Sequence, residues 1–330
     1  TENENGLSGR IKASYLKRFK SKWSIFKINT DASYNSTETN SDWGNIGSFF
    51  LTGVNTSQSN FRDNINEKQS YTGSVSIAHK TGNYYLIEPG TEAGMTIQST
   101  NRTEGLTNGE NPLIDYLFST QYNFIRPSLT FKFNKKKKHL SLALKTEFME
   151  INNQLGDQNI YTKNYIYLTP RFNYENEYKS GRRYSVNYNA RINQPSVNSL
   201  LPISNNRNPL LISFGNPSLK PEYQHQIRAN WSIFDQFSFT SFFSGFSFSY
   251  VKDKVTWQTK INDDLSRIQT PVNTDNYYSS SINADVSTPI RPLKITINFE
   301  LGETYNKGIN ILNGAENITE SFTHEARLSF

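Results

Sequence analysis

The 330-residue chain contains no cysteine, only two methionines and only 35% hydrophobic residues. The absence of cysteine excludes disulfide bonds and cysteine-ligated metal sites. No stretch approaches the roughly 18 consecutive apolar residues that a membrane-spanning helix needs. Mean hydropathy is −0.66. These shortages exclude a helical membrane protein. They also argue against an ordinary soluble core, for which about 45–50% apolar residues is typical on a count that includes glycine, because adding the 18 glycines still leaves this chain short.

Aromatic residues are abundant in spite of this deficit. The chain has 22 Phe and 19 Tyr, and aromatics make up 14% of it. Disordered chains are poor in aromatics, so disorder does not explain the low hydropathy. A membrane β-barrel does, because only alternate residues in a band of each strand must be apolar.

The net charge of +6 does not indicate a nucleic-acid partner. Most Lys and Arg residues alternate with apolar residues, and the one dense run, Lys135–Lys138, falls where a tight turn is expected. We therefore expect no nucleic acid among the partners.

Strict alternation of apolar and polar residues repeats along the chain, and a period of two is typical of β-strands. Between 140 and 148, for example, one face carries Leu140, Leu142, Leu144 and Phe148, and the other carries Ser141, Ala143, Lys145 and Glu147. The pattern predicts about thirteen strands, with a further short one near 46–56. The expected strands are 7–19, 23–37, 69–80, 84–100, 116–133, 139–152, 161–177, 183–194, 221–234, 237–258, 275–287, 293–305 and 319–330.

Short and long connections alternate between these segments. The long polar stretches are 38–68, 101–115, 153–160, 195–220, 259–274 and 306–318. Outer-membrane barrels have short periplasmic turns and long extracellular loops. The sequence thus predicts an all-β fold, a transmembrane antiparallel up-and-down β-barrel in contact with outer-membrane lipids. A closed bacterial barrel has an even strand count, so we interpret 1–330 as a single barrel domain that is incomplete.

One motif carries a family resemblance. Residues 215–222 read GNPSLKPE and lead directly into an alternating segment, 223–234. This resembles the GNPxLKPE element of TonB-dependent outer-membrane receptors, and the matching residues are Gly215, Asn216, Pro217, Leu219, Lys220, Pro221 and Glu222. Proline stiffens the chain and is excluded from central strands, while Gly and Asn permit a sharp turn. The motif therefore marks an entry from a loop into a strand.

The resemblance implies an outer-membrane receptor that takes up a scarce ligand, such as a siderophore, a carbohydrate or a peptide. It also implies a plug domain and TonB as partners. Family barrels have about 22 strands and a plugged lumen, and neither a plug nor a TonB box is recognisable in 1–330.

Polar residues of the expected extracellular loops are the candidate ligand contacts. They are Asn101, Arg102, Asn205, Arg207, Asp263, Asp264 and Arg267. Such residues are more often simply solvated. Four scattered histidines, with no HExxH, GxSxG or P-loop pattern, give no indication of catalysis, so we expect neither an enzyme nor a cofactor or metal site.

Three other interpretations remain open. A passive porin-like or non-transporting barrel would use the charged inner face, including Lys145, Glu147, Arg171, Arg191 and Arg228, to set ion preference. A soluble all-β binding or adhesion protein would instead have short strands and apolar faces packed together. An enzyme is the least favoured reading.

Overall fold

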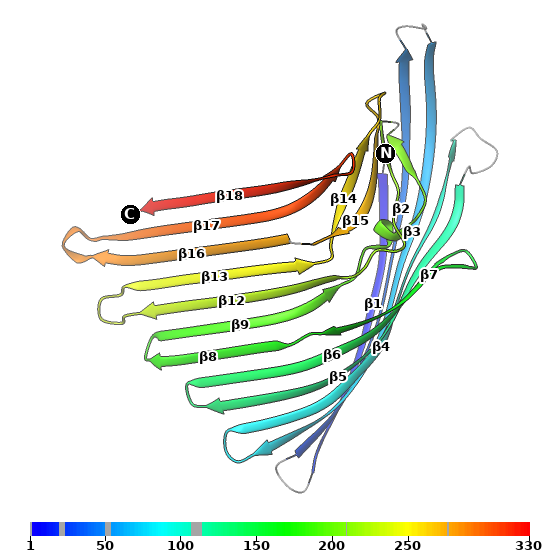
Figure 1. Cartoon of the computed structure of the whole chain (residues 1–330). Helices are drawn as coiled ribbons and strands as arrows, with labels where there is room; N and C mark the ends of the chain where they lie inside the picture. Colours follow the sequence, from blue (N-terminus) through cyan, green and yellow to red (C-terminus); the bar gives the residue numbers. More distant parts are fainter. Residues whose placement is uncertain (1, 20–23, 50–53, 107–113, 209, 276) are drawn as a thin grey trace.

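The computed structural model describes residues 2–19, 24–49, 54–106, 114–208, 210–275 and 277–330. This part of the chain forms one sheet of 18 strands, with one short α-helix and one short 3₁₀-helix (Figure 1). The all-β, antiparallel prediction is confirmed. None of the helices in these ranges is long and apolar enough to cross a membrane.

Long strands make up the wall of the sheet, and neighbours in sequence are hydrogen-bonded antiparallel over most of it. Figure 1 shows short turns along one rim and long hairpins at the opposite end. The first nine strands are β1 (Glu2–Arg18), β2 (Ser24–Phe49), β3 (Val54–Thr81), β4 (Tyr85–Leu106), β5 (Ile114–Lys135), β6 (Lys138–Leu155), β7 (Gln158–Leu168), β8 (Arg171–Lys179) and β9 (Arg182–Asn193).

The second half begins with a folded loop that contains the helix and two strands, and it continues with the wall. The elements are α1 (Val197–Leu200), β10 (Asn205–Asn208), β11 (Leu211–Ser213), β12 (Glu222–Phe234), β13 (Ser241–Lys252), β14 (Lys254–Ile261), β15 (Arg267–Thr274), β16 (Tyr277–Ile290), η1 (Arg291–Leu293), β17 (Ile295–Leu312) and β18 (Ala315–Ser329).

The outermost strands of the wall are β1 and β18. Within the described residues, β1 pairs only with β2 and β18 only with β17. Every residue of both strands is exposed. The sheet in this structure is therefore an open, curved part of a barrel wall with two free edges.

Two expected strands are broken. The segment expected at 161–177 is split at Thr169–Pro170 into β7 and β8, because proline donates no ladder hydrogen bond. The segment expected at 237–258 is split at Asp253, whose φ of 54° interrupts the strand between β13 and β14. Residues 237–240 belong instead to a turn, in which Phe239 has a φ of 58°.

Parts of the expected loops are strands. Stretch 38–68 was expected to be a loop with a short strand at 46–56, but β2 and β3 run through it as one long hairpin; residues 50–53 lie outside the described ranges. β10, β11 and β15 likewise lie in expected loops. Backbone ladders form these polar strands without an apolar face, so the alternation in the sequence does not reveal them.

The two faces of the wall differ, as the alternation predicts. We call the face that contacts residues 195–219 the inner face and the opposite one the outer face. Large apolar residues stay exposed on the outer face, including Leu129, Leu144, Phe148 and Ile166. The inner face is polar towards the short turns, but near the long hairpins it carries the buried cluster Tyr122, Phe124, Met149 and Ile151. The inner face is therefore partly apolar at that end.

Candidate functional site

Residues 194–208 and 210–221, which we call the folded segment, fold back onto the inner face at the end of the long hairpins. Leu200 of α1, the C-cap residue Leu201 and Leu219 of the GNPSLKPE segment form a buried cluster with Phe118 of β5. The Tyr122 hydroxyl donates to the Pro195 carbonyl at 3.4 Å, and the Asn153 side chain donates to the Pro217 carbonyl at 2.7 Å. The segment therefore covers the inner wall at the mouth of the barrel.

Gly215 allows the closest contact within this folded segment. Its N–H donates to the Leu201 carbonyl at 2.8 Å, and the neighbouring Asn216 N–H donates to the Ser199 carbonyl at 2.7 Å. A Cβ on Gly215 would lie only 2.2 Å from the Leu201 oxygen. Glycine is thus required here by close backbone approach, and not by an unusual φ.

Asn216 shapes the turn that follows. Its side-chain oxygen accepts from the Ser218 N–H at 3.0 Å and from the Ser218 hydroxyl at 2.6 Å. Its side-chain nitrogen donates to the Pro271 carbonyl of β15 at 3.1 Å. The amide therefore closes a local turn and joins it to β15.

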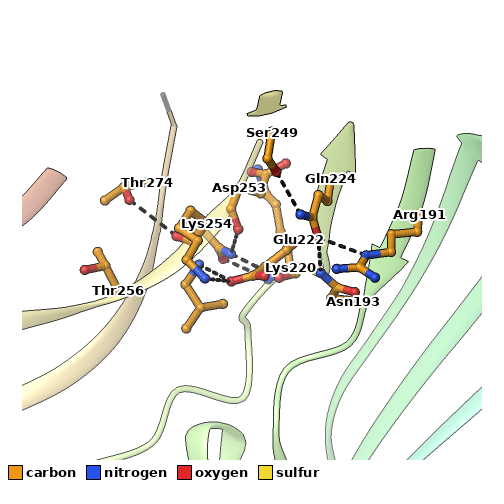
Figure 2. A network of polar contacts seen from close by, with 12 residues as sticks. Arg191, Asn193, Lys220, Glu222, Gln224, Ser249, Asp253, Lys254, Thr256 and Thr274 are labelled. Atoms are coloured by element: carbon orange, nitrogen blue, oxygen red, sulfur yellow. Dashed lines mark hydrogen bonds and ion pairs between the residues drawn. The ribbon is translucent and has the colours of Figure 1, made fainter. Parts of the chain in front are cut away.

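Lys220 and Glu222 fix the start of β12, as Figure 2 shows. Glu222 Oε1 accepts from Lys254 Nζ at 2.9 Å and from the Val255 N–H at 3.0 Å. Lys220 Nζ lies 3.5 Å from an Asp253 carboxylate oxygen. These contacts anchor the β14–β15 hairpin to the beginning of β12.

A side-chain amide two residues further along β12 bridges three strands (Figure 2). Gln224 Oε1 accepts from Arg191 Nε at 2.9 Å and from Asn193 Nδ2 at 3.2 Å. Gln224 Nε2 donates to Ser249 Oγ at 2.8 Å. The network ties β9, β12 and β13 together on the inner face.

Two polar cavities open beneath the folded segment. One, of about 580 Å³, lies between the inner faces of β3 to β5 and residues 192–196, and Lys68, Thr96, Gln98 and Gln194 are among the residues that line it. The second, of about 410 Å³, lies among β5, β6, β8 and β9. Both include Arg126 and Ile192 in their lining, so they form neighbouring parts of one polar surface.

The candidate ligand contacts are not gathered into one site. Asn101 is exposed, whereas its neighbour Arg102 is buried and donates from Nε to Asn64 Oδ1 at 3.1 Å. Arg102 is therefore held within the wall of the barrel. The side chains of Asn205 and Arg207 lie outside the described part of the structure, although their backbone belongs to β10.

The remaining three candidates lie at the tip of the β14–β15 hairpin. Asp263 and Arg267 are exposed. Asp264 accepts from the Ser266 hydroxyl and N–H, and these hydrogen bonds hold the pKa of Asp264 below its ordinary value. Asp264 therefore shapes the turn. The structure brings this tip near residue 210, because the Arg267 N–H donates to the Leu210 carbonyl at 2.9 Å.

Several residues of the mouth were missed from the sequence. Asn153 and Asn273 hold the folded segment in place, and Gln224 joins the strands beside it, yet each lies in or beside an ordinary strand pattern. The sequence offers one signal that this segment folds inward: pairs of apolar residues, such as Leu200–Leu201, occur in an otherwise polar stretch.

Comparison with solved structures supports the barrel fold. The copper transporter OprC superposes with a TM-score of 0.58 at 10% identity, covering 91% of this chain and 46% of that one. The ferric-catecholate import receptor Fiu from K12 E. coli gives 0.54 at 11% identity, covering 96% and 48%. The siderophore receptor PiuA from Acinetobacter baumannii gives 0.53 at 12% identity, covering 96% and 49%.

At such identities the likeness concerns the fold alone, and the chain spans about half the length of these structures. None of the curated proteins compared with the chain matches it. The model of the outer membrane protein beta-barrel family matches residues 17–330. The chain therefore belongs to the outer membrane protein beta-barrel family, located in the cell outer membrane.

Proposed function

We propose that the chain forms part of the barrel wall of a TonB-dependent outer-membrane receptor that imports a scarce ligand, such as a siderophore, a carbohydrate or a peptide. The plug domain and TonB lie outside this chain. The observation that carries the proposal is the inward fold of residues 194–221, packed on Phe118 through Leu200, Leu201 and Leu219. A mouth narrowed in this way suits capture of a ligand better than free diffusion.

Two further observations support capture at the mouth. The polar cavities beneath the folded segment have the volumes typical of small-molecule sites, about 300–1,000 Å³. The solved proteins OprC, Fiu and PiuA, which share the fold, are described as a transporter, an import receptor and a siderophore receptor.

The test uses the full-length gene product. We expect cells that carry it to accumulate one labelled probe from a set of a ferric siderophore, a maltodextrin and an oligopeptide, and a protonophore to abolish that accumulation. In planar bilayers the purified protein should give no steady ohmic conductance. Steady conductance together with protonophore-insensitive accumulation would contradict the proposal and indicate a passive porin.

A further inference from the structure

The smaller polar cavity of the inner face has an excess of positive charge. Arg126, Lys145, Arg171 and Arg191 line it, and the only carboxylate among the residues described in its lining is Glu147. Ser128, Thr130 and Thr169 add hydroxyl groups to the same surface. The cavity adjoins the end of β9, close to Asn193–Ser196, where the chain leaves β9 for the folded segment.

Two of the four cations are neutralised within the wall. Arg126 Nη1 lies 2.7 Å from Glu92 Oε1, and Arg126 Nη2 lies 2.8 Å from Glu147 Oε1. Lys145 Nζ lies 3.6 Å from the second oxygen of Glu92. Two carboxylates therefore balance Arg126 and Lys145.

Arg171 and Arg191 have no such counter-charge. Both are exposed on the inner face, and within the described residues neither lies within ion-pair distance of a carboxylate. Arg191 uses Nε to donate to Gln224 Oε1, which orients its guanidinium and leaves the two terminal nitrogens for another acceptor (Figure 2).

The ladder places Arg171 and Arg191 as diagonal neighbours on the inner face. Arg171 of β8 pairs with Asn189 of β9, and Arg191 lies two residues further along β9 on the same face. Such diagonal neighbours have Cα atoms about 7–8 Å apart, which long side chains span. Arg171 also pairs with Ala143 of β6, so Lys145 is its diagonal neighbour on the other side.

We propose that this cavity binds an oxyanion group of the ligand, a carboxylate or a phosphate, between Arg171 and Arg191. Guanidinium groups match both oxyanions through paired N–H donors, and the nearby hydroxyls suit a ligand that is rich in oxygen. The inference deepens the proposed function and rests on it, because it assigns an acidic group to the imported ligand.

The experiment is calorimetric titration of the purified full-length protein at low salt with citrate, inorganic phosphate and neutral sucrose. We expect one anion to bind, more weakly as salt increases, and sucrose not to bind. Binding of citrate alone identifies the carboxylate as the recognised group, and binding of phosphate alone identifies the phosphate. The double variant R171Q/R191Q should weaken that binding by at least about tenfold, because the loss of even one charge-assisted hydrogen bond is worth roughly a factor of ten.

The matched control is Arg228→Gln. Arg228 is exposed on the inner face of β12, opposite Asn187, but does not line the cavity. The variant Arg228→Gln should leave anion binding unchanged. The variant R171K/R191K keeps the positive charge but loses the planar guanidinium, so it should bind the anion with intermediate affinity. Heat-modifiable migration in a gel verifies that each variant is folded.

Three outcomes would overturn the inference: no binding of either anion, wild-type affinity in R171Q/R191Q, or an equal loss in Arg228→Gln. Energy-dependent uptake without anion binding would leave the proposed function standing and remove this site. Anion binding together with protonophore-insensitive uptake would keep this anion site and contradict the proposed energy-dependent import.

Discussion

The side-chain amide of Asn273 exchanges two hydrogen bonds with the backbone of Lys220. Its oxygen accepts from the Lys220 N–H at 2.8 Å, and its nitrogen donates to the Lys220 carbonyl at 3.0 Å. The same nitrogen donates to the Asp253 carbonyl at 2.7 Å. One amide thus replaces a short piece of backbone ladder at the point where the GNPSLKPE segment enters β12.

Asn273→Ala should therefore destabilise the mouth of the barrel. The substitution leaves the Lys220 N–H and two carbonyl groups without their partner, which costs about 1–3 kcal/mol. Urea unfolding of the full-length protein in detergent measures the loss. Asn159→Ala is the control, because the Asn159 side chain is exposed and, among the described residues, bonds only to Tyr161 and Thr162 nearby in the chain. Equal effects of the two substitutions would contradict the assigned role.

Gly215→Ala should loosen residues 194–221. The added Cβ would meet the Leu201 oxygen at 2.2 Å and the Leu201 nitrogen at 2.6 Å, so the backbone must move. Limited proteolysis should then cleave this segment faster than in the wild-type protein. Gly73→Ala is the matched control, since a Cβ at Gly73 would meet nothing within 4 Å. An unchanged cleavage rate in Gly215→Ala would show that the close approach is not needed.

Arg126→Met should be strongly destabilising. Arg126 sits between Glu92 and Glu147, and its removal leaves the buried Glu147 carboxylate without its ion-pair partner and Glu92 with Lys145 alone. Breaking a buried pair in this way costs about 3–5 kcal/mol. Arg183→Met breaks the exposed pair with Glu175, and the expected change there is at most about 1 kcal/mol. Thermal unfolding monitored by circular dichroism would compare the two, and a similar small loss in both would refute the prediction.

The tip of the β14–β15 hairpin should be sensitive to acid through Asp264. Hydrogen bonds from the Ser266 hydroxyl and N–H lower its pKa in the folded state. A lowered pKa means that this contribution to stability is complete above the unfolded value of about 3.9 and disappears as the pH falls through the folded value. Hydrogen exchange of the Ser266 amide should therefore accelerate only below about pH 4.

The control for the acid effect is Asp264→Asn, which keeps an acceptor oxygen but does not titrate. In that variant the acid-induced loss of protection at Ser266 should disappear. Loss of protection in the wild-type protein well above pH 4, or the same acid effect in Asp264→Asn, would assign the pH dependence to another group.

Strand positions could be predicted because the wall has one apolar and one polar face. Each expected strand, from 7–19 to 319–330, coincides with a described strand or with two strands in tandem. Polar strands could not be found in this way. The upper half of the β2–β3 hairpin, where Thr39 pairs with Asn64, is held by its backbone ladder and shows no alternation of hydrophobicity.

The site was harder to predict than the fold. The GNPSLKPE motif could be recognised as an entry into a strand, but its partners at Asn153, Pro271 and Asn273 lie more than 50 residues away in sequence. Arg102 was expected to contact ligand because it lies in a polar stretch, yet the structure buries it beside Asn64. Neither outcome follows from local composition, since both depend on which strands are neighbours.

The parallel pairing of β11 with β15 joins two segments that are separate in sequence. Leu211 pairs with Arg267 and Ser213 with Gln269, and the β14–β15 hairpin is in turn bonded to Lys220 and Glu222. A graft of residues 195–221 from a homologous barrel would lose these matched registers unless residues 254–274 were exchanged with it. To engineer a new ligand specificity, the two segments must therefore be exchanged together as one unit.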